Sequence, residues 1–355
     1  MATTRRGKIF YADAAKGYTI KVLIDVLAGS LSRTSIRLKN KGIFIKDADC
    51  KKHMLFYISL LREKFRNFRC SKEMIFSLNL KHLQKMVRNV KKKDSMILFI
   101  EKSKPDKLGI SIRPEGGATR RSSRTETMYI TIQKDSNDIV EDFRLPEIHE
   151  TDEGDEVKVY GHPMVIEAPD FQKIKKFSSI GKEVMVKMQR SNYISFYCDS
   201  GEIYSDELSF GETHNTLDSE SDTDDSEYDS EDSGIESEEL THESEGEGES
   251  EDESGEREDE SSEDYSDDDS DEIPELYQAE FFMSTFSLLV KLPGLCSQME
   301  FYAPRVECYP LKIGMNAGFL GDIKIFIKDI HQIAFEESLP QSNSINTNNG
   351  NRSKK

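Results

Sequence analysis

The sequence predicts an α+β fold of two similar domains, each containing two copies of a strand–helix–hairpin repeat. Two observations lead to this prediction. A short apolar segment, an amphipathic helical segment and an alternating hairpin follow one another four times along the chain. A polar stretch at residues 135–160 separates the first two copies from the last two. A generic α+β protein with coincidental spacing is the alternative to these four repeats.

The first copy shows the pattern most clearly. It opens with a strand at residues 8–13 and continues into a helix at residues 18–31. Apolar side chains in that helix recur from Ile20 to Leu31 at the spacing of one helical face. Alternating apolar residues on both sides of a turn at residues 39–42 then predict a hairpin.

The other three copies repeat this order. The second consists of a strand at 74–78, a helix at 80–90 and a hairpin formed by residues 96–100 and 108–112. The third consists of a strand at 164–167, a helix at 168–180 and a hairpin that turns near 190–192. The fourth consists of a strand at 277–282, a helix at 284–292 that Pro293 ends, and strands through residue 327.

The formal net charge of −19 averages two regions of opposite charge. Residues 218–275 contain 31 acidic side chains and one basic side chain, whereas the other 297 residues contain 47 basic and 36 acidic side chains. So acidic a segment, with so few apolar residues, cannot bury a core. We therefore expect a disordered acidic insert at residues 212–275.

These observations divide the chain into domains. We expect an N-terminal domain at residues 1–134, a linker at 135–160 and a C-terminal domain at 161–335, which the acidic insert interrupts. Residues 336–355 are expected to form a disordered tail, since their end is rich in Asn and Ser.

The sequence lacks the signals of several protein classes. No apolar run of about 18 residues predicts a membrane-spanning helix, and no apolar signal core follows the N-terminus. The five scattered cysteines form no C-x-x-C pair, which favours free thiols in a reducing compartment. No histidine spacing and no phosphate-binding or nucleophile motif indicates a metal, a cofactor or a catalytic centre. We expect a protein that is not an enzyme; the carboxylates of the acidic insert lack the spacing of an ordered metal site.

Basic residues recur on one face of the predicted helices. In the second helix Lys81, Lys85, Arg88 and Lys92 fall at i, i+4, i+7 and i+11, opposite its apolar stripe. The other helices contribute Lys21, Lys173, Lys176 and Lys291. Helices with one buried and one basic face suit the phosphates of duplex DNA, bound without sequence readout. A solvated lysine face is the alternative for any single helix.

On these helices and hairpins the chain resembles the proliferating cell nuclear antigen family, the sliding clamps of eukaryotic and viral DNA polymerases. The matching segments are GYTIK at residues 17–21 with the hairpin that follows it, LKHLQKMV at 80–87, DFQKI at 170–174 and GDIK at 321–324. The resemblance covers residues 8–330 apart from the acidic insert. Its specificity comes from the order and spacing of the matches rather than from any single one.

This resemblance implies the DNA clamp fold, assembled as a homotrimeric ring with helices lining a central hole and sheets outside. It implies a processivity factor that encircles duplex DNA, depends on a clamp loader, and tethers the replicative DNA polymerase and repair proteins. The family positions that touch DNA fall on Lys21, Lys85, Arg88, Lys173, Lys176 and Lys291. Strands at residues 108–113 and 203–210 are expected to pair at their edges between subunits.

The resemblance also implies an apolar pocket for short peptide motifs of partner proteins. By alignment this pocket falls on Ala48, His53, Met54, Phe143, Leu145, Pro146, Pro310 and Phe326. Ordinary core or loop packing is the alternative for each of them. The chain departs from the family pattern by one extra residue between Gly42 and His53, and by Lys328–Asp329 in place of a small residue and a proline. The motif preference of the pocket therefore stays open.

The acidic insert has three candidate uses: recruiting basic proteins, solubilising the ring, or competing with DNA for the basic lining. A passive solubility segment is the alternative. Its Ser-Asp and Ser-Glu pairs, such as Ser226–Glu227, are typical sites of an acid-directed kinase. The basic loop at residues 120–124 is either a DNA-side or targeting element or a solvated loop.

A rival interpretation of the whole chain is a histone-chaperone-like or scaffold protein that uses its acidic tract and does not encircle DNA. The two interpretations differ in mass and in retention on circular DNA. The clamp interpretation places the protein in the nucleus, or at a cytoplasmic viral replication site if the chain comes from a large DNA virus.

Overall fold

The computed structural model describes residues 7–114, 126–134, 148–150, 156–189, 193–201, 203–211 and 276–338. All of them belong to one compact unit formed by residues 1–213 and 273–355. Residues 214–272 are a separate unit, outside the described residues. The expectations for the acidic insert, the basic loop at 120–124 and the Asn/Ser-rich end of the tail also lie outside the described residues.

The first half of the chain contains both strand–helix–hairpin copies. The first copy is β1 (Lys8–Ala14), α1 (Gly17–Ser30), β2 (Arg33–Lys39) and β3 (Gly42–Ala48). Three elements that the sequence analysis left out follow it: β4 (Met54–Leu61), η2 (Arg62–Lys64) and β5 (Asn67–Cys70). The second copy is β6 (Met74–Asn79), α2 (Leu80–Val87), β7 (Ser95–Glu101), β8 (Lys104–Arg113), β9 (Glu126–Thr131) and β10 (Gln133–Lys134).

The second half repeats the order after a short hairpin, β11 (Ile148–Glu150) and β12 (Glu156–Lys158). The third copy is β13 (Met164–Glu167), α3 (Ala168–Phe171), η3 (Gln172–Ser179), β14 (Glu183–Gln189), β15 (Tyr193–Asp199) and β16 (Ser205–Phe210). The fourth is β17 (Leu276–Phe282), α4 (Met283–Leu289), η4 (Leu292–Gly294), β18 (Gln298–Tyr302), β19 (Leu311–Asn316) and β20 (Gly321–Ile327), and α5 (Ile330–Ser338) follows it.

Two helices differ from the prediction. α2 ends at Val87 rather than at residue 90, and a turn follows it. The helix predicted at 168–180 is α-helical only in its first four residues and continues as the tighter 3-10 helix η3. The Ser178 and Ser179 hydroxyls donate to the carbonyls of Lys175 and Lys176, three residues back, at 2.7 Å. Such local hydrogen bonds favour a tight turn over a regular α-helix.

A nine-stranded antiparallel sheet joins the two halves, in the order β10-β6-β2-β3-β4-β20-β19-β18-β13. β4 and β20 meet inside it, with Ile58 opposite Ile323. Gly42 at the start of β3 and Gly321 at the start of β20 have φ angles of +154° and +153°. A side chain at either position would collide with the backbone of β4. These two glycines therefore permit β3 and β20 to approach β4 from both sides.

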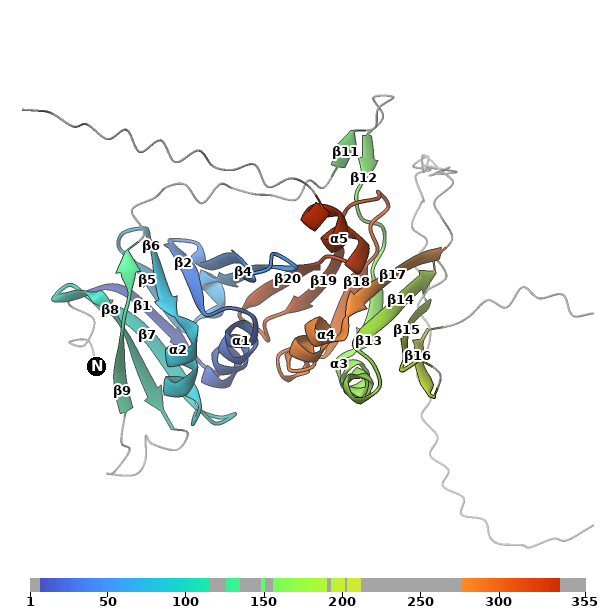
Figure 1. Cartoon of the computed structure of the whole chain (residues 1–355). Helices are drawn as coiled ribbons and strands as arrows, with labels where there is room; N and C mark the ends of the chain where they lie inside the picture. The colour runs from blue at the N-terminus through green and yellow to red at the C-terminus, as the bar shows by residue number, and fades with distance from the viewer. Residues whose placement is uncertain are drawn as a thin grey trace, which may run out of the picture. The chain divides into compact units, whose positions relative to one another are not determined.

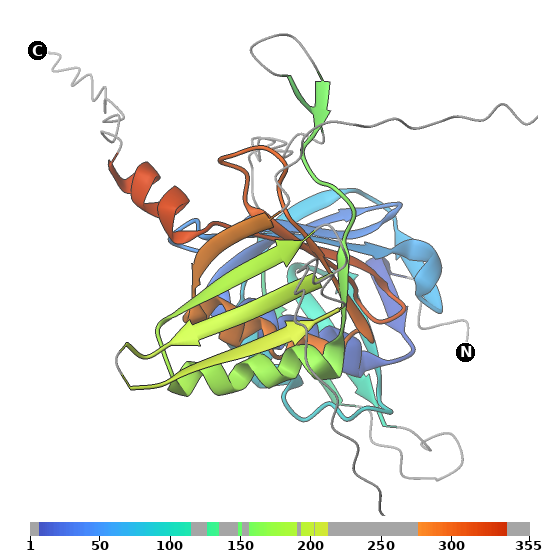
Figure 2. The ribbon, with the colours of Figure 1, turned by 90° about the vertical axis from the view of Figure 1, so that its right-hand side faces the viewer.

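Four helical segments pack side by side on these sheets, in the order α2, α1, α4 and α3–η3 (Figure 1). Seen from the right-hand side of Figure 1, α3–η3 runs beneath β14, β15 and β16 (Figure 2). Fully buried rings anchor the C-terminal helices: the Phe171 ring centroid lies 5.6 Å from Phe301 and 6.2 Å from Phe196. Each helix thus buries one face and leaves the other available.

The other sheets end in edges that bear on assembly. One is five-stranded, in the order β5-β1-β7-β8-β9, and one is four-stranded, in the order β16-β15-β14-β17. The expectation that residues 108–113 form a subunit edge is wrong, because β9 pairs along β8 and places Ile130 opposite Leu108. Among the described residues, β9 is the edge there. β16 lies at an edge of its sheet, as expected.

Candidate nucleic-acid interface and partner pocket

α2 presents an exposed basic stripe, formed by Lys81, Lys85 and Arg88. The side chain of Asn79 starts the helix by accepting a hydrogen bond from the His82 amide at 2.9 Å. Leu80, Leu83 and Val87 are buried, whereas the three basic side chains are exposed. None of the three makes an ion pair with any residue that the structure describes. The full charge of the stripe is therefore available to an anion.

The basic residues of η3 are in a different electrostatic setting. Lys173 forms an ion pair with Asp170 at 2.8 Å, and Lys176 forms one with Asp206 of β16 at 2.5 Å. Both lysines are exposed, while Ile174 and Phe177 are fully buried beneath them. The two carboxylates offset part of the charge that this helix presents to solvent.

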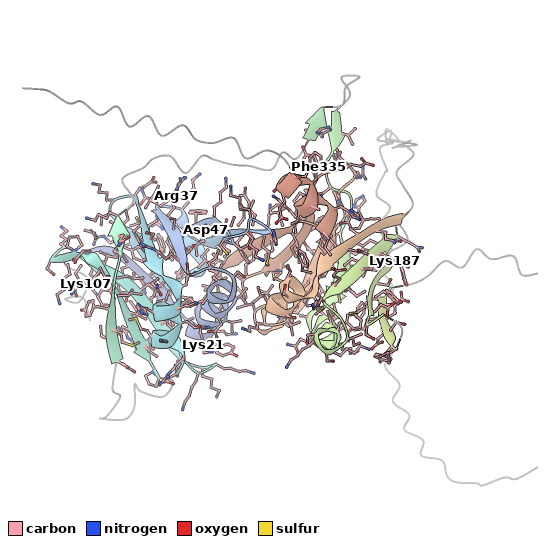
Figure 3. The ribbon with its side chains drawn as sticks, in the orientation of Figure 1. Lys21, Arg37, Asp47, Lys107, Lys187 and Phe335 are labelled. Atoms are coloured by element: carbon pink, nitrogen blue, oxygen red, sulfur yellow. The ribbon has the colours of Figure 1, made fainter. Side chains whose placement is uncertain are left out.

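The remaining two predicted DNA-contacting residues lie on the central helices. Lys21 is half-buried on α1, where it pairs with Asp25 at 2.9 Å. Asp25 also accepts a hydrogen bond from Gln84 of α2 at 3.0 Å, which joins the two helices. Lys291 is exposed directly before η4. Figure 3 shows Lys21 on the helix side of the unit and Arg37 and Asp47 on the strand side.

The predicted partner pocket is assembled from neighbouring strands of the nine-stranded sheet. Leu55 of β4 lies between Ala48 of β3 and Phe326 of β20, and Met54 lies opposite Ile327. Phe326 is 8% exposed, because the Tyr57 and Tyr160 rings lie 5.5 and 6.2 Å from its ring centroid. Met54 and Pro310 are buried as well. Phe143, Leu145 and Pro146 lie outside the described residues.

His53 connects this group to the C-terminal strands. Its ring stacks on Phe282 of β17 at 5.9 Å, and its carbonyl accepts a hydrogen bond from the Lys328 amide at 3.0 Å. The Tyr160 hydroxyl donates to the Pro310 carbonyl at 2.8 Å. Burial raises the pKa of both Tyr160 and Tyr277, so these phenols stay protonated. The sequence analysis did not identify either tyrosine as part of the group.

α5 borders the same region and was also missed. Its first turn is closed by two reciprocal hydrogen bonds: the Gln332 amide donates to the Asp329 carboxylate at 2.7 Å, and the Asp329 amide donates to the Gln332 side chain at 3.2 Å. The Gln332 side chain also donates to the Tyr309 carbonyl at 2.8 Å. Asp-x-x-Gln is a helix-start signal that the sequence does contain. Lys328–Asp329, noted as a departure from the family, is thus where this helix begins.

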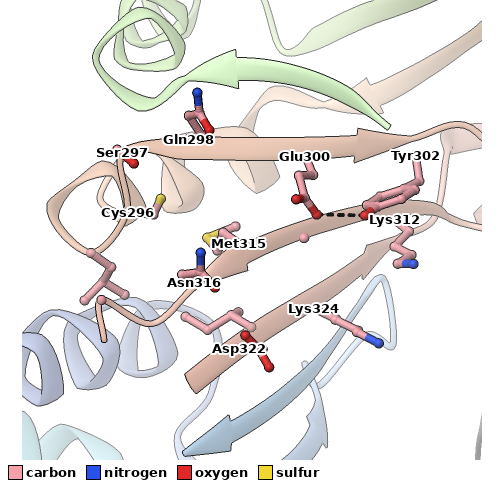
Figure 4. A pocket seen from close by; sticks show the side chains of 14 residues that line it. Cys296, Ser297, Gln298, Glu300, Tyr302, Lys312, Met315, Asn316, Asp322 and Lys324 are labelled. Carbon is pink, nitrogen blue, oxygen red and sulfur yellow. Dashed lines mark hydrogen bonds between the residues drawn. The ribbon is translucent and has the colours of Figure 1, made fainter. Parts of the chain in front are cut away.

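A cavity of about 470 Å³ lies on the outer face of β18, β19 and β20 (Figure 4). Its lining residues include Glu300, Tyr302, Lys312, Gly314 and Lys324. The Tyr302 hydroxyl donates to the Glu300 carboxylate at 2.7 Å. Burial and this carboxylate raise the pKa of Tyr302 to about 12. None of the predicted site residues lines this cavity.

The described ranges contain neither a candidate metal site nor a candidate membrane-spanning helix. No group of three His, Cys, Asp or Glu side chains there is placed to hold a metal ion. No helix within those ranges is long and apolar enough to cross a membrane.

Comparisons with known proteins agree with the fold. Residues 9–138 match the family model described as "Proliferating cell nuclear antigen, N-terminal domain". A curated relative, "Proliferating cell nuclear antigen 2" of Plasmodium falciparum, is 21% identical over 182 residues, which is 50% of this chain and 63% of the relative. "DNA polymerase sliding clamp 1" of Pyrobaculum aerophilum is 26% identical over 94 residues, 26% of this chain and 36% of the relative. The chain thus matches less than two thirds of the length of either.

A solved structure extends the likeness beyond the N-terminal half. The proliferating cell nuclear antigen of Entamoeba histolytica superposes with a TM-score of 0.60 and covers 91% of this chain and 99% of its own. The identity in that superposition is 13%. The described parts of both halves therefore share the fold of that protein, including the repeated strand–helix–hairpin units.

Proposed function

We propose that the chain is a member of the proliferating cell nuclear antigen family and acts as a DNA polymerase sliding clamp, a non-enzymatic ring that encircles duplex DNA. The match of residues 9–138 to the N-terminal family model, the relatives named above and the shared fold support this proposal. The observation that carries the proposal is the α2 stripe, whose three exposed cations have no ion-pair partner among the described residues. A ring retains DNA by topology, so the lining needs only weak contacts to phosphates. Such contacts are independent of sequence and permit sliding.

The edges of the sheets support ring assembly. β9 ends a five-stranded sheet and β16 ends a four-stranded sheet. Pairing β9 of one copy with β16 of the next would form a nine-stranded sheet, like the one that already joins the two halves of the chain. A head-to-tail contact of this kind closes into a ring when the rotation fits, and it covers both exposed edges. We propose that three copies close the ring.

The pocket region supports a role as a tethering platform. We propose that Ala48, His53, Met54, Pro310 and Phe326, together with the three linker residues predicted at 143, 145 and 146, receive peptide segments of the polymerase, the clamp loader and repair proteins. The buried state of Phe326 implies that Tyr160 or Tyr57 shifts when a peptide binds. The protein would act in the nucleus or at a cytoplasmic viral replication site.

Mass in solution tests the ring directly. Light scattering on the full chain should give three times the protomer mass of 40.6 kDa. Replacing Tyr129 of β9, which is 40% exposed, with Asp should give monomers, because a charge would enter the edge contact. Val165→Asp on β13 is the control, since Val165 is 46% exposed and β13 ends a different sheet. A wild-type chain that is monomeric and does not bind duplex DNA would contradict the clamp and support the acidic scaffold instead.

A further inference from the structure

A second basic cluster surrounds the start of α1. Its members are Lys16, Arg66, Arg88, Lys91 and Lys92, and together we call them the rim patch. All five side chains are exposed. Lys93 is also exposed, but it has an interaction partner of its own and is left out of the patch. Arg88 belongs to the α2 stripe described above, and Lys92, which the sequence pattern also assigned to that stripe, lies beyond the end of α2 at Val87.

A rigid turn after α2 holds two of these lysines. The Lys91 amide donates to the Asp94 carboxylate at 2.8 Å, and the Asp94 amide donates back to the Lys91 carbonyl at 3.1 Å. The Asp94 carbonyl in turn accepts a hydrogen bond from the Gly17 amide at 2.7 Å. A side chain at Gly17 would press against Met96 and Asp94. The turn is therefore fixed directly against the first residue of α1.

Arg66 approaches the same segment from another element. Its guanidinium donates to the Ala15 carbonyl at 3.3 Å and lies 3.8 Å from the Asp13 carboxylate. Lys16 directly follows Ala15 in the chain, and its ammonium lies 5.8 Å from the centre of the Phe319 ring. Arg66, which directly precedes β5, and the turn after α2 thus both contact the chain at residues 15–17, where α1 starts.

The charge of the rim patch is only weakly offset. Among the described residues, Asp13 and Asp94 are the carboxylates in contact with it, and both are buried, at 6% and 7% exposure. Asp13 pairs with Arg66, whereas the Asp94 carboxylate accepts a hydrogen bond from the Lys91 amide and forms no ion pair with the Lys91 or Lys92 ammonium. The N-terminus of the 14-residue helix α1 adds partial positive charge at the same place. The patch therefore forms a strongly positive surface.

We propose that the rim patch is a second phosphate-binding surface, which holds duplex DNA beyond the end of the α2 stripe. Arg88 lies in both groups, so the basic surface continues from the helix face onto the turn without a break. DNA that contacts the stripe would then meet Lys91 and Lys92 as it leaves the helix layer. This inference rests on the proposed function, because it assigns further residues to the binding of the same ligand.

Salt-dependent binding tests the rim patch. The variant Lys91→Gln/Lys92→Gln removes two charges and leaves the α2 stripe intact. Its matched control, Lys102→Gln/Lys107→Gln, removes two exposed charges from the β7–β8 hairpin. Lys102 follows the far end of the seven-residue strand β7, about 26 Å from Asp94 at 3.3 Å per residue. The reference variant Lys81→Gln/Lys85→Gln reports on the stripe.

The measurement is fluorescence anisotropy of a labelled duplex that extends beyond the helix layer, with the full chain and a salt titration. Each lost phosphate contact lowers the slope of log affinity against log salt by about 0.9. For the rim variant we expect the magnitude of this slope to fall by about 1.8, because two phosphate contacts are lost. We expect its affinity at low salt to fall on the order of tenfold. The control should stay within about twofold of the wild type.

The outcomes separate the inference from the function on which it rests. A stripe variant that weakens binding together with a rim variant that matches the control overturns the rim patch alone. A rim variant that binds DNA more tightly than the wild type also overturns it, and indicates the acidic insert as the occupant. A wild-type chain that does not bind the duplex overturns the proposed function and the inference with it.

Discussion

α2 and α3–η3 occupy the two outer places in the row of four helical segments, one in each half of the chain, but they present their charge differently. Both bury an apolar face and both expose basic side chains. The cations of α2 have no ion-pair partner among the described residues, whereas Lys173 and Lys176 each pair with a carboxylate. A basic stripe in the sequence therefore does not determine how much positive charge a helix presents to DNA, because carboxylates from other elements can pair with it. α2 should therefore contribute more to DNA binding than α3–η3.

The largest expected effect is on stability, and it comes from the buried apolar side chains that both helices have. Phe177→Ala should lower the free energy of unfolding by about 3–5 kcal/mol and Leu83→Ala by about 2–5 kcal/mol, since both create cavities. Phe177 is 0% exposed and Leu83 is 4% exposed. Urea denaturation of each variant measures this. A loss below about 1 kcal/mol at Phe177 would mean that η3 is not anchored by its apolar face.

Removing the charge of α2 is expected to have the second largest effect. Lys81→Gln/Lys85→Gln/Arg88→Gln should weaken duplex binding by on the order of a hundredfold at 0.1 M salt, because three phosphate contacts are lost. Anisotropy with a labelled duplex measures the affinity. Circular dichroism serves as the control for folding. An effect no larger than that of any exposed triple lysine variant elsewhere would contradict the role of α2.

The corresponding change in η3 should have a smaller effect. Lys173→Gln/Lys176→Gln should weaken binding by about tenfold or less, since each lysine must first leave a carboxylate before it contacts a phosphate. The same anisotropy assay measures it. If this variant loses more affinity per charge than the α2 variant, the two helices contribute in the reverse order and the comparison fails.

Releasing a lysine of η3 gives the smallest expected effect. Asp206→Asn removes the partner of Lys176 and should raise affinity for the duplex by about twofold to threefold. Asp199→Asn, on the neighbouring strand β15, is a matched control without an ion pair among the described residues. Stability should change by less than about 1 kcal/mol. Equal affinity for both variants would show that the pair does not compete with DNA.

Features of the site that follow from local periodicity could be predicted from the sequence. Features that depend on tertiary contacts could not. The stripe of α2 is visible because Lys81, Lys85 and Arg88 follow helical periodicity. The Lys176–Asp206 pair joins residues 30 positions apart, so nothing near η3 signals it. The burial of Phe326 depends on Tyr160 from the linker, which is likewise a distant contact.

Two misses did have local signals. The strand β9 was left out because it follows a long polar stretch, although Met128 and Ile130 alternate in it. The sequence analysis predicts no helix after the last strand, although Asp329 and Gln332 form a helix-start signal. α5 runs to Ser338, so the first three residues of the predicted disordered tail are helical.

The central claim is that the chain encircles DNA, and threading onto a linear duplex tests it most directly. The full chain is incubated with a duplex that carries biotin at both ends, and streptavidin then blocks the ends. The salt concentration is raised until phosphate contacts are screened. The account predicts that the protein stays with the blocked duplex and leaves when a restriction enzyme cuts it. Loss from the uncut duplex at that salt would contradict encirclement.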